Sequence, residues 1–337
     1  MAVHRLAGVA LLAILLGPQI GDRAAAGEVP APLVLEATIP LGNVAGRLDH
    51  MAIDTARRHL FLAELGNGSL AMVDLADRKL LRRVTGLKEP QGVAYLADAD
   101  LLAVADGGDG ALLFLDPRDL APLGRLELGS DADNLHLDGA SGHLVAGYGE
   151  GALAIIDPKS HAKLADIPLG SHPEGFQITA DGRQVFVNLP DAHRIAAIDL
   201  RAGREIASWL LTRLRSNFPL AVRSDGGVIA VAFRAPPTLA LLDAGSGGFL
   251  AQQRSCSDAD DVFFDGRRQR IYLSCGDGAV DVFDRDKGGG LRRLARIETS
   301  SGARTSLFVP QLDRLYVAAR AGMIGGEARI LVFRPQP

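Results

Sequence analysis

The chain has 337 residues, a formal net charge of −4, 39 glycines, one tryptophan and two cysteines. This mild charge gives no electrostatic case for a nucleic-acid partner or for attraction to an anionic membrane, so both are excluded from the expected partners. The many glycines, and apolar residues that are aliphatic rather than aromatic, are typical of short strands joined by tight turns.

The N-terminus has the pattern of an export signal. A short cationic start ending at Arg5 precedes an uninterrupted apolar run over residues 6–16, too short to span a bilayer. Small residues at 24–27 predict cleavage near Ala26 or Gly27. We therefore predict a signal peptide over residues 1–27 and a single mature domain over residues 28–337, monomeric, periplasmic or secreted, without a membrane anchor. The alternative is a buried or membrane-anchoring N-terminal helix.

A repeat of about 40 residues fills the rest of the chain. Short β-branched or leucine-rich runs end in a recurrent aspartate, at Asp74, Asp116, Asp157, Asp199, Asp243 and Asp284. A seventh copy ends at Arg334. A period of this length is typical of propellers and solenoids, whose units bury their apolar faces only against one another.

Each unit has the same internal order. In the fourth unit, apolar runs at residues 175–179, 184–187 and 194–198 are separated by turn residues, and another run follows Arg204. This order predicts an all-β, seven-bladed β-propeller with four antiparallel strands per blade. Residues 33–39 match the outer strand of the other units, and the last unit lacks one, so we expect the N-terminal strand to pair in the last blade and close the ring.

This layout sorts the loops onto two faces. Loops before the first strand and between the second and third strands of each blade open on one face, the upper face. The recurrent aspartates then lie on the opposite, lower face, where each is expected to accept hydrogen bonds from its own turn.

Polar residues gather in the loops of the upper face, which should reach the central mouth. Carboxylates dominate units one to four and six, whereas arginines mark units five and seven. The candidate ligand-binding residues are Asp49, His50, Gln91, Asn134, His172, Glu174, Asn217, Asp261 and Arg304. The alternative is that these polar residues are solvated loop tips.

Some of these residues suit a metal or acid–base chemistry. Oxygen ligands converging from several blades suit calcium, and the candidate ligands are Asn134, Glu174, Asn217 and Asp261. No EF-hand spacing is present, and the fold requires no cofactor. His50 and His172 are candidate general bases, with structural hydrogen bonding as the alternative.

Other features of the sequence predict structure rather than catalysis. The nucleophile elbow, the His-Glu-x-x-His motif, the Walker loop and the Cys-x-x-Cys-His haem motif are all missing. The glycine-rich residues 105–110 and 275–278 are expected to form hairpin turns. Cys256 and Cys275 fall at the upper end of unit six and predict a disulfide, with two free thiols as the alternative.

The segments at residues 58–74, 184–188 and 195–199 resemble the YVTN-type propellers, most closely the YncE-like periplasmic proteins. The resemblance covers about residues 33–335 and implies a binding propeller rather than a defined activity. Residues 234–237 and 321–327 depart from it and could shape a site particular to this chain. The chain is more distantly similar to gluconolactonase and regucalcin-type propellers, whose calcium site lies near the axis but which have six blades. Its likeness to WD-repeat proteins is architectural.

These patterns predict an exported, non-enzymatic module that binds a small ligand or an exported protein at its upper mouth. The alternative is a metal-dependent hydrolase such as a lactonase, with carboxylates holding a calcium-type ion and His50 or His172 moving protons.

Overall fold

The computed structural model describes residues 1–2, 31–285, 289–322 and 326–337. The predicted signal peptide and its cleavage point fall on residues 3–30, outside this description. Within the described residues, no helix is long and apolar enough to cross a membrane.

Residues from Ala31 onward build seven sheets of four antiparallel strands, as the repeat predicts. Blades one to three consist of β2 (Met51–Asp54), β3 (His59–Glu64), β4 (Ser69–Asp74) and β5 (Lys79–Thr85); β6 (Pro90–Leu96), β7 (Leu101–Asp106), β8 (Ala111–Leu115) and β9 (Pro122–Glu127); and β10 (Ala132–Leu137), β11 (Leu144–Tyr148), β12 (Ala152–Asp157) and β13 (Ala162–Pro168). Blades four and five consist of β14 (Phe176–Ile178), β15 (Gln184–Leu189), β16 (Arg194–Asp199) and β17 (Arg204–Leu210); and β18 (Arg215–Val222), β19 (Val228–Ala235), β20 (Pro237–Asp243) and β21 (Phe249–Arg254). Blade six consists of β22 (Ala259–Asp265), β23 (Arg270–Cys275), β24 (Ala279–Arg285) and β25 (Leu291–Glu298), and two 3-10 turns occupy Leu65–Asn67 and Ala97–Ala99.

The seventh blade closes the ring. It joins β26 (Ser306–Val309), β27 (Arg314–Ala319) and β28 (Ala328–Pro335) to β1 (Leu33–Gly42), which pairs antiparallel with β28 from Leu33 opposite Pro335 to Gly42 opposite Ala328. The predicted closure by the N-terminal strand is therefore confirmed. Because β1 covers the edge that β28 would otherwise expose, the last blade has the same four strands as the others.

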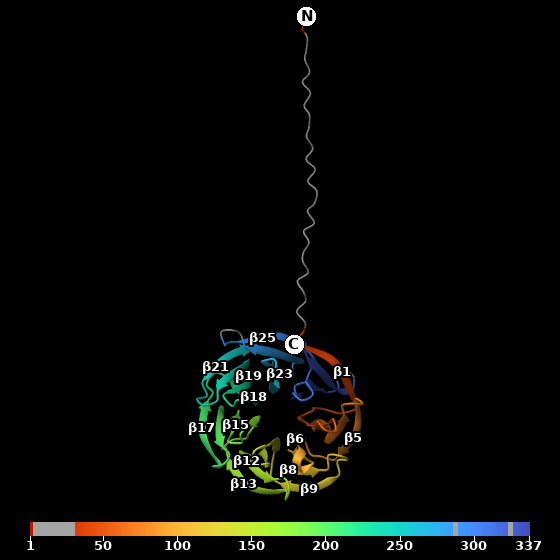
Figure 1. Cartoon of the computed structure of the whole chain (residues 1–337), viewed down its shortest axis with the longest axis vertical. Coiled ribbons are helices and arrows are strands. Elements are labelled where there is room, and N and C mark those ends of the chain that lie inside the picture. Colours follow the sequence, from red (N-terminus) through yellow and green to blue (C-terminus); the bar gives the residue numbers. More distant parts are fainter. Residues whose placement is uncertain (3–30, 286–288, 323–325) are drawn as a thin grey trace. The chain divides into compact units, whose positions relative to one another are not determined.

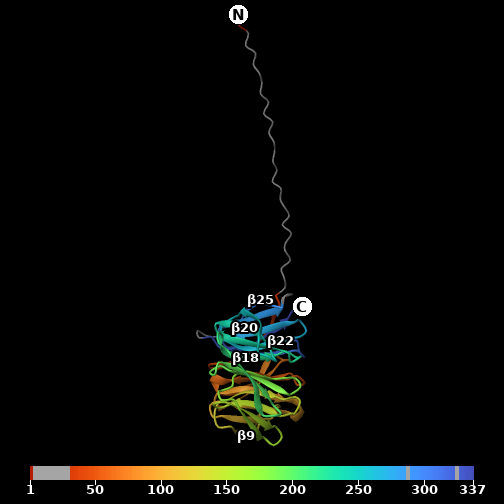
Figure 2. The same ribbon diagram turned by 90° about the vertical axis from the view of Figure 1, so that its left-hand side faces the viewer.

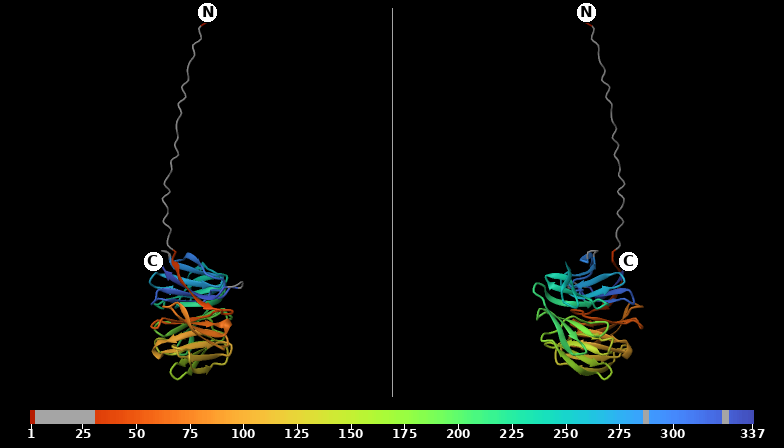
Figure 3. Two further views of the ribbon diagram at one scale, coloured as in Figure 1. Left: turned by 90° about the vertical axis from the view of Figure 1, so that its right-hand side faces the viewer. Right: turned by 60° about the vertical axis from the view of Figure 1, so that its left-hand side comes forward.

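The blades stand around a common axis, with β5, β9, β13, β17, β21, β25 and β1 at the rim of the ring (Figure 1). The side views show the blades stacked against one another around the ring (Figures 2 and 3). The second strand of a blade packs against neighbours on both faces, so β3 is buried along almost its whole length, whereas the outer strand β5 is largely exposed. Stacking of adjacent blades thus supplies the core.

The recurrent aspartates have the structural role that the sequence predicts. Asp74 Oδ1 accepts hydrogen bonds from the backbone N–H groups of Ala76 (2.7 Å) and Asp77 (2.9 Å). The equivalent aspartates of blades two to five accept the same kind of bond from their own turns, and they are Asp116, Asp157, Asp199 and Asp243. The Asp284 carboxylate pairs with the Arg292 side chain, and residues 286–288 of its own turn lie outside the described residues.

The two glycine-rich segments also lie where they are expected. Residues 107–110 join β7 to β8, and residues 276–278 join β23 to β24, both as hairpin turns. Neither segment precedes a helix, so neither offers the helix N-terminus that a phosphate-binding loop uses.

Candidate functional site

The first strand of several blades is interrupted by a β-bulge where it leaves the upper face. The register shifts between Pro90 and Val93, Ala132 and Leu135, Asn217 and Leu220, and Ala259 and Asp261. A bulge bends a strand and re-aims its side chains. Consecutive residues can therefore face the central axis, as Asp133 and Asn134 do when they line the same cavity.

The strand pairings identify equivalent positions in all seven blades. In each blade, one residue of the first strand pairs with the structurally equivalent residue of the second strand. In blades one to seven these first-strand residues are Met51, Val93, Leu135, Phe176, Leu220, Val262 and Ser306. Two positions earlier in each blade lie Asp49, Gln91, Asp133, Glu174, Phe218, Asp260 and Arg304, and all seven line one cavity of about 200 Å³. We call these seven residues the mouth ring. Each blade thus contributes one residue, four of which are carboxylates.

A larger cavity of about 980 Å³, which we call the channel, adjoins the mouth ring. The two cavities share His50, Asn134, Gly175 and Asp260 as lining residues, so they lie next to each other. The channel is lined by the six apolar residues among those paired first-strand positions, which are Met51, Val93, Leu135, Phe176, Leu220 and Val262. A polar entrance therefore opens into mainly apolar walls.

Two carboxylates of the mouth ring are neutralised by arginines. Asp49 accepts hydrogen bonds from two guanidinium nitrogens of Arg47. Asp260 lies between Arg234 Nη2 at 2.6 Å and Arg304 Nε at 3.1 Å. The Arg234 guanidinium also lies 3.7 Å from the centroid of the Phe218 ring. Charge is therefore balanced on the side of the mouth formed by blades one and five to seven.

The other two carboxylates, Asp133 and Glu174 on neighbouring blades, have no such partner, and we call them the acidic pair. Asp133 is only 8% exposed, and the one hydrogen bond that its side chain makes comes from Asn134 Nδ2 at 3.4 Å. Among the described residues the Glu174 side chain makes no hydrogen bond and no ion pair, although His172, Arg234 and His50 attract it from a greater distance. Burial, reinforced by the nearby Glu174, raises the pKa of Asp133 to about 7, and burial raises that of Glu174.

His50 lies between the carboxylates of Asp49 and Asp261, of which Asp49 is buried and Asp261 partly exposed. Its Nε2 is 3.7 Å from Asp49 Oδ1, and its Nδ1 is 3.7 Å from Asp261 Oδ1. Burial disfavours a charged imidazole, but the attraction of Asp261 and Asp49 outweighs it and raises the pKa of His50 to about 9. Burial raises the pKa of Asp261 to about 7, and its Oδ2 accepts a hydrogen bond from the Ser306 N–H at 2.7 Å.

His172 lies at the edge of the mouth, close to the acidic pair. Its Nδ1 is 2.6 Å from the Gly149 carbonyl and therefore donates, and it is 3.5 Å from Asp131 Oδ2. Burial opposes its charge, yet the Gly149 carbonyl and Asp131 together raise the pKa of His172. Deeper in the channel, burial lowers the pKa of His136 to about 4, so this imidazole is neutral at physiological pH.

Eight of the nine candidate residues predicted from the sequence line one or both cavities, and they are Asp49, His50, Gln91, Asn134, His172, Glu174, Asp261 and Arg304. Asn217 lies apart from them. It is fully buried, and its Nδ2 donates to Asn188 Oδ1 at 2.9 Å and to the Arg194 carbonyl at 3.1 Å. Asn217 therefore ties two strands of blade four to blade five instead of facing the mouth.

Seven residues that line the mouth cavity were not among the predicted ones: Arg47, Asp131, Asp133, Gly175, Phe218, Arg234 and Asp260. Three of them belong to the mouth ring, so aligning the repeats on their first strands would have found them. Of the two segments that depart from the family pattern, residues 234–237 place Arg234 at the mouth, next to a cis Ala235–Pro236 peptide. The other, residues 321–327, includes positions 323–325 outside the described residues.

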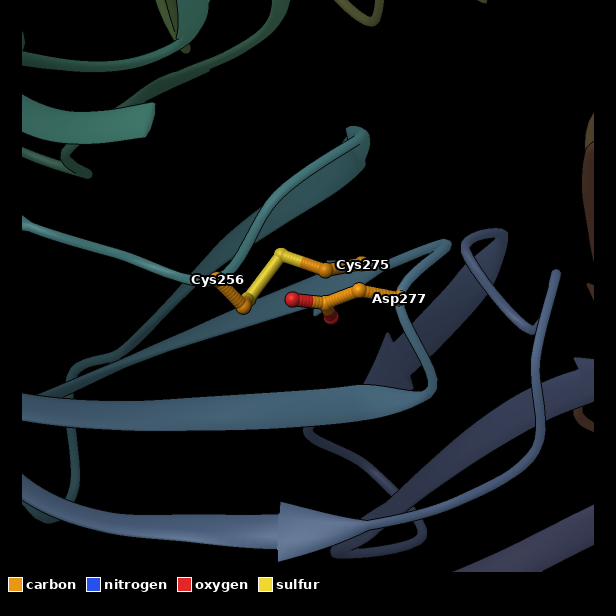
Figure 4. Close-up of side chains that lie close together, drawn as sticks. All are labelled: Cys256, Cys275 and Asp277. Atoms are coloured by element: carbon orange, nitrogen blue, oxygen red, sulfur yellow. A yellow bond between two sulfur atoms is a disulfide. The ribbon is translucent and has the colours of Figure 1, made fainter. Parts of the chain in front are cut away.

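Metal-binding groups converge at one place in the described residues, and it is not the mouth. Cys256, Cys275 and Asp277 have ligand atoms within 4.8 Å of one another. The two cysteines form the predicted disulfide, with Cα atoms 5.8 Å apart (Figure 4). Asp277 Oδ2 is occupied by the Ser257 backbone N–H and by Arg296, each at 3.0 Å. Of the four predicted calcium ligands, Asn134, Glu174 and Asp261 line the cavities and Asn217 does not.

Comparisons with known proteins bear on the fold alone. No protein-family model matches the chain, and no curated protein sequence matches it either. Among solved structures, a chain of Kuenenia stuttgartiensis hydrazine synthase superposes with a TM-score of 0.75 at 16% identity, over 85% of this chain and 94% of that one. A chain from a mitotic checkpoint complex superposes with a TM-score of 0.77 at 13% identity, over 98% of this chain and 100% of that one. These likenesses are consistent with the seven-bladed propeller.

Proposed function

We propose that the chain is an exported, non-enzymatic binding protein that holds a small ligand at its upper mouth. The observation that carries the proposal is the mouth ring above a channel of about 980 Å³. Ligand sites in proteins are typically concave and mostly apolar, with a few convergent polar groups that fix orientation. The buried Asp133 is within reach of a molecule that enters the cavity, whereas the surface of a folded protein partner would not reach it.

Export is supported by two independent features. The N-terminal sequence has the cationic start, apolar run and small residues of a signal peptide. The Cys256–Cys275 disulfide suits a protein that matures in an oxidising compartment. We place the mature protein, residues 28–337, in the periplasm or outside the cell as a monomer without a membrane anchor. On its repeat sequence we group it with the YVTN/YncE-like propellers.

The geometry favours binding over the alternative of a calcium-dependent hydrolase. At neutral pH His50 carries a proton between Asp49 and Asp261, and a protonated imidazole cannot act as a general base. Calcium binding and hydrolysis stay predictions, which elemental analysis and a screen of lactones and esters would test.

A retention experiment tests the proposed function. The full chain is expressed with its leader, purified after export, incubated with a small-molecule extract and separated from unbound compounds by gel filtration. We expect mass spectrometry to find a compound retained at about one per protein by the wild type. Asp133→Asn/Glu174→Gln should lose it, whereas a matched surface variant, Asp77→Asn/Glu127→Gln, should keep it. Retention of nothing, or equal retention by both variants, would contradict a ligand site at the mouth.

A further inference from the structure

Some carboxylates of the mouth ring are paired with arginines and others are not, and this difference indicates one class of ligand. Arg47 neutralises Asp49, and Arg234 and Arg304 share Asp260, so three of the mouth's cations are already engaged. The acidic pair has no arginine or lysine partner among the described residues. An anionic ligand would therefore meet no free guanidinium here. A cationic group would find two carboxylates that His50 and His172 attract but that form no ion pair with any described residue.

Burial makes this unpaired state costly for the free protein. Burial and the nearby Glu174 disfavour ionisation of Asp133, and the attraction of His50 and His172 offsets this only in part, so the pKa of Asp133 is raised to about 7 and the pair takes up a proton below that pH. Asp133 is the more buried of the two and makes only one long hydrogen bond, from Asn134. Asp133 also lines the mouth cavity. A ligand cation in this position would replace the proton and would supply the positive charge and the hydrogen-bond donors that the protein itself does not place there.

The space beneath the acidic pair decides between an organic and a metal cation. Calcium requires six to eight oxygen ligands, and in the described residues the acidic pair belongs to no group of three His, Cys, Asp or Glu ligand atoms within 4.8 Å. An ammonium group needs only one or two carboxylates. Leu135 and Phe176, from the same two blades, line the channel directly below, where an apolar body could lie.

We propose that the acidic pair recognises the protonated amine of a small organic molecule whose apolar body fills the channel. This proposal rests on the proposed function and names its ligand class. The amine donates hydrogen bonds to Asp133 and Glu174, and the apolar body displaces water from the channel walls. Asn134, which donates to Asp133, orients that carboxylate.

Four probes test the proposal by isothermal titration calorimetry with the full chain purified after export. They are octylammonium, 1-octanol and octanoate, which share an eight-carbon chain and differ in charge, and calcium chloride. We expect octylammonium to bind at least about tenfold more tightly than 1-octanol or octanoate, because a charge-assisted hydrogen bond is worth that much in affinity. We also expect its binding to release protons to the buffer near pH 6.5, because the ligand cation displaces the proton held by the pair.

Asp133→Asn/Glu174→Gln should bind octylammonium at least about tenfold more weakly and no better than 1-octanol. Asp77→Asn/Glu127→Gln, which makes the same substitutions at carboxylates that are 60% and 64% exposed, should bind like the wild type. If the double variant does not fold, as judged by circular dichroism, Glu174→Gln alone should still weaken octylammonium binding severalfold.

Three results would overturn the proposal. Equal or tighter binding of 1-octanol or octanoate would contradict an amine-specific site but leave a ligand-binding mouth in place. Calcium binding that is lost in Asp133→Asn/Glu174→Gln would show that the acidic pair serves a metal. Failure of every probe to bind would also contradict the proposed ligand class. The proposed function itself would be contradicted only if the retention experiment found no bound compound as well.

Discussion

Carboxylates lie at both ends of this propeller, and their surroundings differ. On the lower face, Asp116 accepts hydrogen bonds from the side chain and backbone N–H of Arg118, which lower its pKa to about 2. On the upper face, Asp133 is buried beside Glu174, and its pKa is raised to about 7. The same residue type is thus stabilised as an anion at one end and destabilised as an anion at the other.

This difference distinguishes carboxylates that stabilise the fold from carboxylates that belong to the candidate binding site. A carboxylate whose hydrogen bonds come from its own turn contributes to folding, because the native structure supplies its partners. A buried carboxylate without such partners reduces stability, and proteins keep such strain mainly where they bind or react. The lower aspartates are therefore structural, and the acidic pair is the best candidate for function.

The largest effect is expected from removing the strand that closes the ring. Deletion of residues 28–40 removes most of β1 and leaves β28 without the partner that runs from Leu33 to Gly42. We expect the truncated protein to be unfolded, because an open ring exposes a sheet edge and the apolar faces of the last blade. Circular dichroism and thermal melting measure this directly. An unchanged melting temperature would show that the scaffold does not depend on closure.

The next largest effect is expected at a lower-face aspartate that is fully engaged. Asp265 is 2% exposed and accepts hydrogen bonds from two backbone N–H groups, the Arg268 side chain and the Tyr272 hydroxyl. Asp265→Ala leaves the buried Tyr272 hydroxyl and two backbone N–H groups without their acceptor, while Arg268 keeps Asp313, and it should lower the free energy of unfolding by about 3 kcal/mol. Urea denaturation checks this value.

Asp133→Asn, at the upper face, should behave in the opposite way in the same urea series. It removes a charge that burial disfavours, so we expect its free energy of unfolding at pH 8 to equal or exceed that of the wild type. A loss similar to that of Asp265→Ala would remove the distinction between the two ends of the propeller.

Loss of the disulfide should lower the free energy of unfolding about as much as Asp265→Ala does, but it should act near the mouth. Cys256 and Cys275 are 19 residues apart, and closing a loop of this length stabilises a protein by roughly 3 kcal/mol. The bond holds the segment that leads to Asp258, the partner of Arg304. We expect Cys256→Ala/Cys275→Ala to melt at a lower temperature and to bind the octylammonium probe more weakly. Unaltered melting would show that blade six is held by packing alone.

The smallest effect is a pH dependence of stability. The folded pKa of His50, about 9, exceeds the unfolded value of 6.5, so its stabilising contribution is complete below pH 6.5 and is lost as the pH rises through 9. Asp133 and Asp261, raised to about 7 from 3.8, also contribute most at low pH and lose that contribution as the pH rises through 7. The melting temperature should therefore fall by several degrees from pH 6 to pH 10, and His50→Gln should flatten the alkaline part of this decline. An identical pH profile in His50→Gln would place its pKa near the ordinary value.

The fold was predictable because its signal is repeated and local. The spacing of Asp74, Asp116 and their equivalents gave the number of blades, and the unmatched strand at residues 33–39 gave the closure. The two cysteines fell on one end of one blade, and their bond is confirmed. Each of these inferences needs only strand order and turn chemistry, which neighbouring residues determine.

The site was predictable only in outline, because the direction of a side chain depends on contacts between blades. Asn217 and Asp133 both lie near the start of a first strand, yet one is buried against blade four and the other faces the cavity. The β-bulges that decide this do not follow from residue types. The pairing of Arg234 with Asp260 likewise joins two blades, so the sequence could not show which carboxylates lack a partner.

The most direct test of the difference between the two ends is a carboxyl-carbon NMR titration of the full chain purified after export, with and without octylammonium. In the free protein Asp116 should titrate near pH 2 and Asp133 near pH 7. Saturating octylammonium should lower the pKa of Asp133 by at least about one unit and leave Asp116 unchanged. If Asp133 titrates near pH 4 and does not respond to the amine, the upper carboxylates are ordinary surface groups and the mouth is not a cation-binding site.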